Sequence, residues 1–206
     1  IFNVVIMVST GEKRSPIHEL EKARSLKLER TKDGNIVVMT PTGSETGNRN
    51  SEIIGDLIIW NRQTNYGRVF DSSSGFTLPD GSVLSPDASI IAHHRWEQLS
   101  KEERRKFAPI CPEFVIELKS DTDQLSVLQT KMQNWLNNGA KLGWLIDPAQ
   151  EQVLIYQPNT EVKTVTGFVD GFLKGSIHQL IVSDTRHHTS LAIPQPFYCS
   201  NPSTAG

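Results

Sequence analysis

Two carboxylates and a lysine occupy β-type segments of this 206-residue chain, in a pattern that could bind a divalent cation. Asp87 begins the run DASII, and Glu117 and Lys119 belong to the run FVIELKS. Successive side chains of a strand point to opposite faces, so Glu117 and Lys119 share one face. Burying a charge is costly unless it is paired or binds a metal. The spacing therefore predicts a polar partner for this face.

The interval between Asp87 and Glu117 is long enough for a loop, a short helix and a neighbouring strand. Carboxylates brought together from adjacent strands repel each other, which raises the pKa of at least one unless a cation lies between them. Mg²⁺ accepts one or two carboxylates together with water and substrate phosphate. Lys119, as a compact charge, would hold a phosphate oxygen or orient a water. This pattern predicts metal-assisted attack of water on a phosphate ester.

Simpler interpretations of the same residues stay open. Asp87 could cap a turn, and Glu117 with Lys119 could form an exposed ion pair of little energetic value. His93 and His94 are adjacent, so in a strand they would point to opposite faces and not share a metal. The run KEERRKF is typical of a solvated helix face, with phosphate contacts by Lys101, Arg104 or Arg105 as the alternative. Three tryptophans are expected in the core: Trp60, Trp135 and Trp144.

The elements that must position these residues alternate between helix and strand, which is typical of a mixed α/β sheet with helices against it. Residues 41–50 are expected to form a loop, Ser51 to cap the next helix and Gly139 to end a later one. The expected helices span residues 16–26, 51–65, 96–107 and 121–139. The expected strands span residues 35–40, 113–120, 142–147 and 153–158, with several short strands within 67–93.

Composition limits the classes of function. The net charge of −2 and the pI of about 6.3 provide no global basic field for nucleic acid, although a local basic groove is compatible with both. The two cysteines, Cys111 and Cys199, form no C-x-x-C pair, which argues against a thiolate zinc site and favours a reducing cytoplasm. The apolar opening IFNVVIMVST is too short to span a membrane and lacks the basic start of a signal peptide.

A wider series of segments resembles a known family. The motif "PD … E-x-K" is the signature of the PD-(D/E)xK nuclease superfamily. The ordered segments TPTGSETGNRNSEIIGDL, GFTLPDGSVLSPDASII, CPEFVIELKSDTDQL and LQTKMQNWLNNGAKLGWLIDP resemble the Uma2 family of restriction-endonuclease-like proteins, known especially in cyanobacteria. The resemblance covers roughly residues 16–158. It implies a restriction-endonuclease-like fold, in which helices flank a mixed central β-sheet.

The resemblance also implies a site and its partners. Asp87, Glu117 and the backbone carbonyl of Leu118 would bind Mg²⁺ or Mn²⁺, with Lys119 as the catalytic lysine. An acidic residue on the first core helix often completes such sites, and Glu52 occupies that position. Lys131 would be a helper or a structural lysine. DNA would be the substrate, and the family is expected to form homodimers.

Three hypotheses for function follow. The first is a metal-dependent DNA endonuclease. The second is a non-catalytic nucleic-acid-binding or mobile-element accessory protein that retains the fold. The third is an inactive divergent copy, because the C-terminal segment departs from the usual ending of the family. Along the chain we expect an N-terminal extension at 1–15, the nuclease-like domain at 16–185 and a divergent, poorly ordered tail at 186–206.

Overall fold

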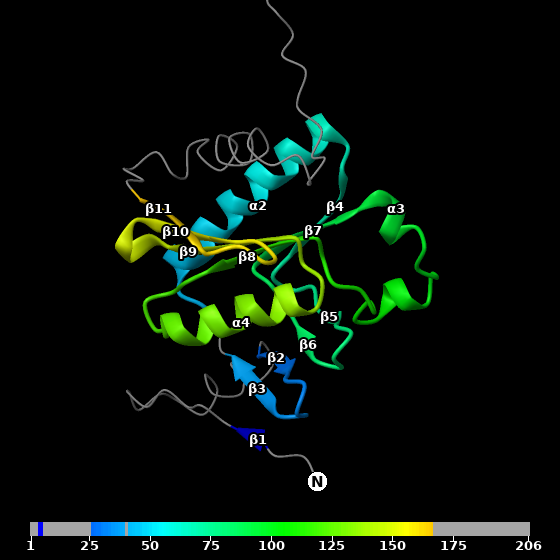
Figure 1. Cartoon of the computed structure of the whole chain (residues 1–206), viewed down its shortest axis with the longest axis horizontal. Helices are drawn as coiled ribbons and strands as arrows, with labels where there is room; N and C mark the ends of the chain where they lie inside the picture. The colour runs from blue at the N-terminus through cyan, green and yellow to red at the C-terminus, as the bar shows by residue number, and fades with distance from the viewer. Residues whose placement is uncertain (1–3, 6–25, 40, 167–206) are drawn as a thin grey trace, which may run out of the picture.

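A six-stranded mixed sheet crosses the middle of the molecule and carries a long helix on each face (Figure 1). The computed structural model describes residues 4–5, 26–39 and 41–166. The parallel pair β8–β9 lies within this sheet, and its other neighbouring strands are antiparallel. The strand order confirms the predicted fold class. In that order the strands are β11 (Lys163–Thr166), β10 (Gln152–Tyr156), β9 (Leu142–Asp147), β8 (Phe114–Leu118), β7 (Ala88–Ala92) and β4 (Gly67–Asp71).

The two long helices pack on opposite faces of this sheet, because side chains of the central strand β8 alternate between them. Helix α2 (Ser44–Thr64) shares one core with the even-numbered apolar residues of β8, Ile116 among them. Helix α4 (Leu125–Asn137) shares the other core with Val115. Glu117 therefore points to the α4 side. None of the helices in the described ranges is long and apolar enough to cross a membrane.

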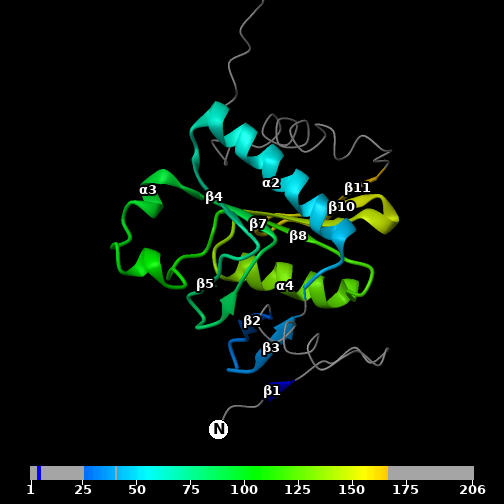
Figure 2. The same ribbon diagram turned by 180° about the vertical axis from the view of Figure 1, so that it is seen from behind.

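A second, smaller sheet lies on the far side of α4, so that α4 runs between the two sheets (Figure 2). Within β2 the usual burial pattern is inverted, since Leu28 is 54% exposed while Glu29 is only 6% exposed. A buried carboxylate needs a partner, and α4 is the element that supplies it. The order of the small sheet is β1 (Val4–Val5), β3 (Ile36–Met39), β2 (Lys27–Arg30), β6 (Val83–Leu84) and β5 (Phe76–Thr77).

Helix α2 begins earlier than the sequence pattern indicated. The predicted loop at 41–50 is helical from Ser44, and Ser51 lies inside the helix, where its hydroxyl donates to the carbonyl four residues earlier. The residues of these first turns are largely polar and lie outside the core. They therefore lack the helical spacing of apolar residues from which a helix is predicted. An ion pair between Glu45 and Arg49, one helical turn apart, supports them instead.

The predicted charged helix at 96–107 is not formed. A short helix, α3 (His93–Trp96), ends at the first residue of this range, and a 3-10 turn, η1 (Glu103–Arg105), follows within it. Ser100 separates them, because its backbone N–H donates to Glu103 Oε2 while the Glu103 N–H donates to the Ser100 hydroxyl. This reciprocal capping starts a new turn rather than continuing the first helix.

Helix α4 ends as predicted, at a left-handed Gly139 with φ of +109°. It starts at Leu125, later than expected, because Asp123 accepts hydrogen bonds from the amide and hydroxyl of Ser120 in the preceding turn. The predicted hairpin of β9 and β10 is confirmed. The expected helix at 16–26 lies outside the described residues except for Leu26, as do the expected N-terminal extension, apart from Val4–Val5, and the C-terminal tail.

Candidate active site

Asp87 and Glu117 lie side by side at the end of the β7–β8 pair, as the sequence predicted. The Asp87 N–H donates to the carbonyl of Ile116 at 3.0 Å. One Asp87 carboxylate oxygen, Oδ2, accepts the N–H of Leu118 at 2.8 Å. Asp87 is therefore held on both sides of Glu117, by its backbone N–H at Ile116 and by its side chain at Leu118.

Glu117 is buried on the α4 face, with 2% of its surface exposed. The indole Nε1–H of Trp135 donates to Oε1 at 2.8 Å, and the Lys131 ammonium donates to Oε2 at 3.0 Å. Burial raises the pKa of Glu117 to about 7; the attraction of Lys131 opposes this rise, and repulsion from Asp87 and Glu29 adds to it. The raised pKa expected for one of two crowded carboxylates is thus found on Glu117.

Lys131 reaches this cluster from α4, which the sequence could not establish. Its ammonium is 2.9 Å from Glu29 Oε1, 3.0 Å from Glu117 and 3.0 Å from the carbonyl of Ser85. An ammonium has three N–H donors, and these three acceptors occupy them. Burial lowers the pKa of Lys131, but the surrounding carboxylates outweigh that effect and raise it. Lys131 is therefore a cation at neutral pH.

Glu29 is a member of the cluster that sequence reasoning missed. Its Oε1 accepts the N–H of Ser85 at 2.9 Å in addition to the Lys131 ammonium. Its strand neighbour Lys27 has its ammonium 4.0 Å from Asp87 Oδ1. Alternation in KLER places Lys27 and Glu29 on one face of a strand, but a strand was not predicted here, and the exposed Leu28 between them shows that apolar character does not mark the buried face.

Lys119 leaves the same face as Glu117, yet its ammonium turns toward the adjacent strand β9. It lies 4.0 Å from Asp147 Oδ1 and donates to the carbonyl of Ser120 at 3.3 Å. Asp147 is 2% exposed, and its Oδ1 has no hydrogen-bond partner in the described part of the chain. Lys119 therefore has N–H donors left over, in contrast to Lys131.

Glu52 and Leu118 lie apart from the charged cluster in different ways. Glu52 is exposed on α2, the helix that covers the opposite face of the sheet, so it is not brought to Glu117. The Leu118 side chain packs in the core beneath α2, while its N–H binds Asp87. The acidic residue added to Asp87 and Glu117 is Glu29 from the small sheet, rather than Glu52.

The cluster has more carboxylates than ammonium groups. Among the described residues, no group of three or more His, Cys, Asp or Glu side chains is arranged to hold a metal ion. A cation here would depend on Asp87 and Glu117, which suits Mg²⁺ because it takes one or two carboxylates and completes its shell with water and phosphate. Three carboxylates (Glu29, Asp87 and Glu117) face two ammonium groups (Lys27 and Lys131), so the donor set fits an additional cation.

Comparisons with known proteins agree with this architecture. The chain is similar in structure to a putative nuclease belonging to DUF820 from Anabaena variabilis ATCC 29413, with a TM-score of 0.57 and 24% sequence identity over 68% of this chain and 76% of that one. At this identity the likeness shows the fold alone. A search of curated proteins finds no match. A family model described as "Uma2: Putative restriction endonuclease" matches residues 15–174, most of the chain. The chain therefore belongs to the Uma2 family.

Proposed function

We propose that this protein is a divalent-metal-dependent nuclease that hydrolyses phosphodiester bonds in DNA, with Asp87, Glu117 and Lys119 as its catalytic residues. The observation that carries the proposal is the carboxylate cluster beside β7–β8, in which burial, together with repulsion from Asp87 and Glu29, raises the pKa of Glu117 to about 7. Membership of the Uma2 family supports the same reaction class.

Asp87, Glu117 and the carbonyl of Leu118 would hold Mg²⁺ or Mn²⁺, which when bound acts as a Lewis acid and makes water a better nucleophile. The chain's own residues prepare this site. The Leu118 N–H orients Asp87, and the Trp135 indole and Lys131 orient Glu117. Glu117 accepts one hydrogen bond on each oxygen from these donors, and carboxylate oxygens have further lone pairs for a cation.

The two lysines have different parts in this proposal. Lys131 has all its donors committed to Glu117, Glu29 and Ser85, so it positions Glu117 and balances its charge. Among the described residues, Lys119 forms one hydrogen bond, to the carbonyl of Ser120, and a longer ion pair with Asp147, so it retains N–H donors. Lys119 is therefore the lysine we assign to the phosphate, where it would stabilise the charge that develops during hydrolysis.

The test is incubation of the purified full chain with supercoiled plasmid and with single-stranded DNA, in Mg²⁺, in Mn²⁺ and in EDTA. We expect cleavage in the metals and none in EDTA. Glu117→Gln and Asp87→Asn should abolish it, while Glu161→Gln, which removes an exposed carboxylate elsewhere, should not. Cleavage that persists in both site variants would assign the activity to another site. Light scattering on the same sample tests whether the protein is the homodimer that the resemblance implies.

One observation favours a second function, a nucleic-acid-binding protein that does not cleave. The Lys131 ammonium lies within hydrogen-bond reach of both Glu117 and Glu29, and thus already supplies a positive charge to the carboxylates a metal would use. DNA binding that is unchanged by Mg²⁺, with no cleavage under any condition, would support this alternative.

A further inference from the structure

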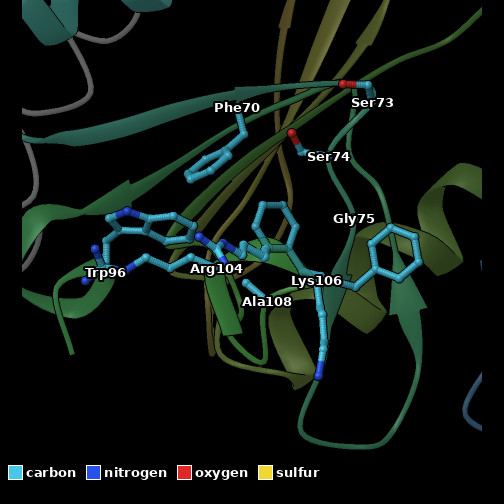
Figure 3. Close-up of a pocket in the computed structure, with 11 residues that line it drawn as sticks. Phe70, Ser73, Ser74, Gly75, Trp96, Arg104, Lys106 and Ala108 are labelled. Carbon is cyan, nitrogen blue, oxygen red and sulfur yellow. The ribbon is translucent and has the colours of Figure 1, made fainter. Parts of the chain in front are cut away.

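A cavity of about 480 Å³ opens beside the edge strand β4, between the turn that joins β4 to β5 and the segment from α3 through η1 (Figure 3). Its volume lies within the range of sites that hold small organic groups. Its lining combines aromatic rings with a run of basic residues. The aromatic residues are Phe70, Phe76, Trp96 and Phe107, and the basic residues are Arg104, Arg105 and Lys106.

Three of the aromatic rings form a fixed wall. The Phe70 ring centroid is 5.0 Å from that of Trp96 and 5.4 Å from that of Phe76, with edge-to-face packing in the second pair. Phe107 differs, because it is 56% exposed. Its ring lies over Gly75, where an added Cβ would come within 2.7 Å of it. Phe107 is therefore the aromatic surface of the pocket that a ligand can still cover.

The basic wall has unused donors. The Arg104 guanidinium lies 5.5 Å from the centre of the Trp96 ring, and its Nε is buried with no hydrogen-bond partner in the described part of the chain. Across the same residues, neither Arg104 nor Arg105 forms an ion pair, whereas Lys106 pairs with Glu102 at 2.7 Å. In Figure 3, Arg104 lies beside Trp96 and Phe70, and Lys106 points away from them.

Acidic side chains near the pocket already have partners: Glu102 pairs with Lys106, and Glu103 accepts the N–H of Ser100. Asp71 Oδ1 accepts the amide and hydroxyl of Ser73, at 3.1 and 2.6 Å, and a longer hydrogen bond from the Ser74 hydroxyl. The unpaired guanidinium groups thus remain available to an anion. Guanidinium groups bind phosphate through paired N–H donors, and aromatic rings stack on nucleobases. The combined lining suits a group that is both planar and anionic.

Ser85 links the pocket to the carboxylate cluster. A Cβ at Gly75 would lie 3.1 Å from the Ser85 hydroxyl. The Ser85 N–H donates to Glu29, and its carbonyl accepts from Lys131. Gly75 of the pocket lining is therefore a neighbour of Ser85 in the cluster, and the pocket and the proposed active site lie on the same face of the large sheet.

We propose that this pocket binds one nucleotide of the DNA strand, with its base against Phe107 and its phosphate on Arg104 and Arg105. The proposal rests on DNA being the substrate. It adds a strand-binding subsite outside the carboxylate cluster, and it places a single-stranded or unstacked nucleotide there, because a base within a duplex cannot present its face to Phe107.

The test measures binding of a fluorescein-labelled single-stranded 12-mer by the full chain in EDTA, where no metal-dependent cleavage occurs. We expect Phe107→Ala to weaken binding about tenfold or more, the usual effect of losing one stacked base. Arg104→Ala and Arg105→Ala should each weaken binding. Each should also make the negative slope of log K against log salt shallower by about 0.7, because one phosphate contact is lost. The controls are Ile59→Ala, an exposed apolar side chain, and Arg62→Ala, an exposed arginine, both on α2.

A second arm uses the same 12-mer with abasic sites in place of its nucleotides. On this strand the effect of Phe107→Ala should disappear, whereas the effects of Arg104→Ala and Arg105→Ala should persist. Phe107 and Arg105 are exposed, so their variants report on the pocket even if Arg104→Ala alters the fold. Binding by the pocket variants that equals binding by the two controls would overturn the proposal.

A third arm competes the labelled strand with a deoxynucleoside monophosphate. The mononucleotide could bind through Phe107 while the affinity for the labelled strand is the same in the pocket variants as in the wild type. In that case the pocket is a site for free nucleotides and the strand proposal is wrong. Cleavage is assayed separately, so the two proposals fail independently. A protein that cleaves DNA but binds it without the pocket overturns only the subsite, and one that binds through the pocket without cleaving overturns only the nuclease.

Discussion

The Lys131 ammonium lies 3.0 Å from the carboxylate of Glu117 and joins helix α4 to the central strand of the large sheet. The same ammonium reaches Glu29 on the small sheet at 2.9 Å. One lysine therefore ties three layers together at the position where chemistry is proposed. Its removal and the removal of its partners should have separable consequences.

Stability should depend on pH through Glu117. Its pKa is raised to about 7 in the folded protein from an ordinary value of 4.5, so between these values the folded state holds a proton that the unfolded state has lost. The stabilisation is complete below 4.5 and is lost as pH rises through about 7, on the order of 3 kcal/mol. Melting curves in EDTA across this interval should show the decline in the wild type but not in Glu117→Gln. Glu161→Gln should follow the wild type, and an identical decline in Glu117→Gln would assign it to another group.

Lys131→Ala should destabilise the fold strongly. It leaves Glu117 and Glu29 buried without their shared cation, and breaking a buried ion pair from one side typically costs about 3–5 kcal/mol. Urea unfolding measures the loss, and Lys141→Ala, at an exposed lysine, is the matched control. Adding Glu117→Gln to Lys131→Ala should restore part of the stability. A variant as stable as the control would show that the ion pair contributes nothing.

Lys119→Ala should reduce cleavage about 10²-fold or more while leaving Mg²⁺ binding intact. The reason is that a positioned charge near developing negative charge acts mainly in the transition state, and lysine is not a metal ligand. Rates of plasmid nicking, with melting curves and Lys141→Ala as controls, provide the measurement. An active Lys119→Ala beside an inactive but folded Lys131→Ala would reverse the assignment of the two lysines.

Mg²⁺ should raise the melting temperature, and more so above pH 7 than below it. Binding stabilises the folded state by about 2.7 kcal/mol when the ion is at a hundred times its Kd, and protonated Glu117 is a poor ligand. Asp87→Asn and Glu117→Gln should lose this shift. A shift of equal size in Asp87→Asn would move the metal to other residues.

Glu29 should influence the site more than Glu52. Glu29 contributes to the raised pKa of Glu117, so Glu29→Gln should move the pH midpoint of cleavage downward. Glu52 is exposed on the helix of the opposite face, and Glu52→Gln should leave the midpoint in place. The pH profile of plasmid nicking by both variants shows which of the two glutamates influences the site. A shift caused by Glu52→Gln alone would support its place as the acidic residue that completes the site.

Several features of the site follow from local sequence. Alternation along Phe114–Leu118 set Glu117 on the face opposite Ile116, and the run DASII marked the strand β7, which begins directly after Asp87. The resemblance to the Uma2 family indicated the mixed sheet and the carboxylates of β7 and β8. These features depend on periodicity within one strand or on an ordered series of segments. Both can be recognised in the sequence without knowledge of tertiary contacts.

Only the tertiary structure decided which side chains surround Glu117. The helical period of α4 predicts which face of the helix is apolar. It does not predict which residues contact a polar side chain beside that face, such as Lys131. Its contacts with Glu117 and Glu29 arise because α4 packs between two sheets. Glu29 comes from a strand with an exposed leucine, and Lys119 turns to Asp147 because parallel pairing sets β9 beside β8. Local patterns specify the face on which a residue lies, whereas packing between distant elements specifies its partners.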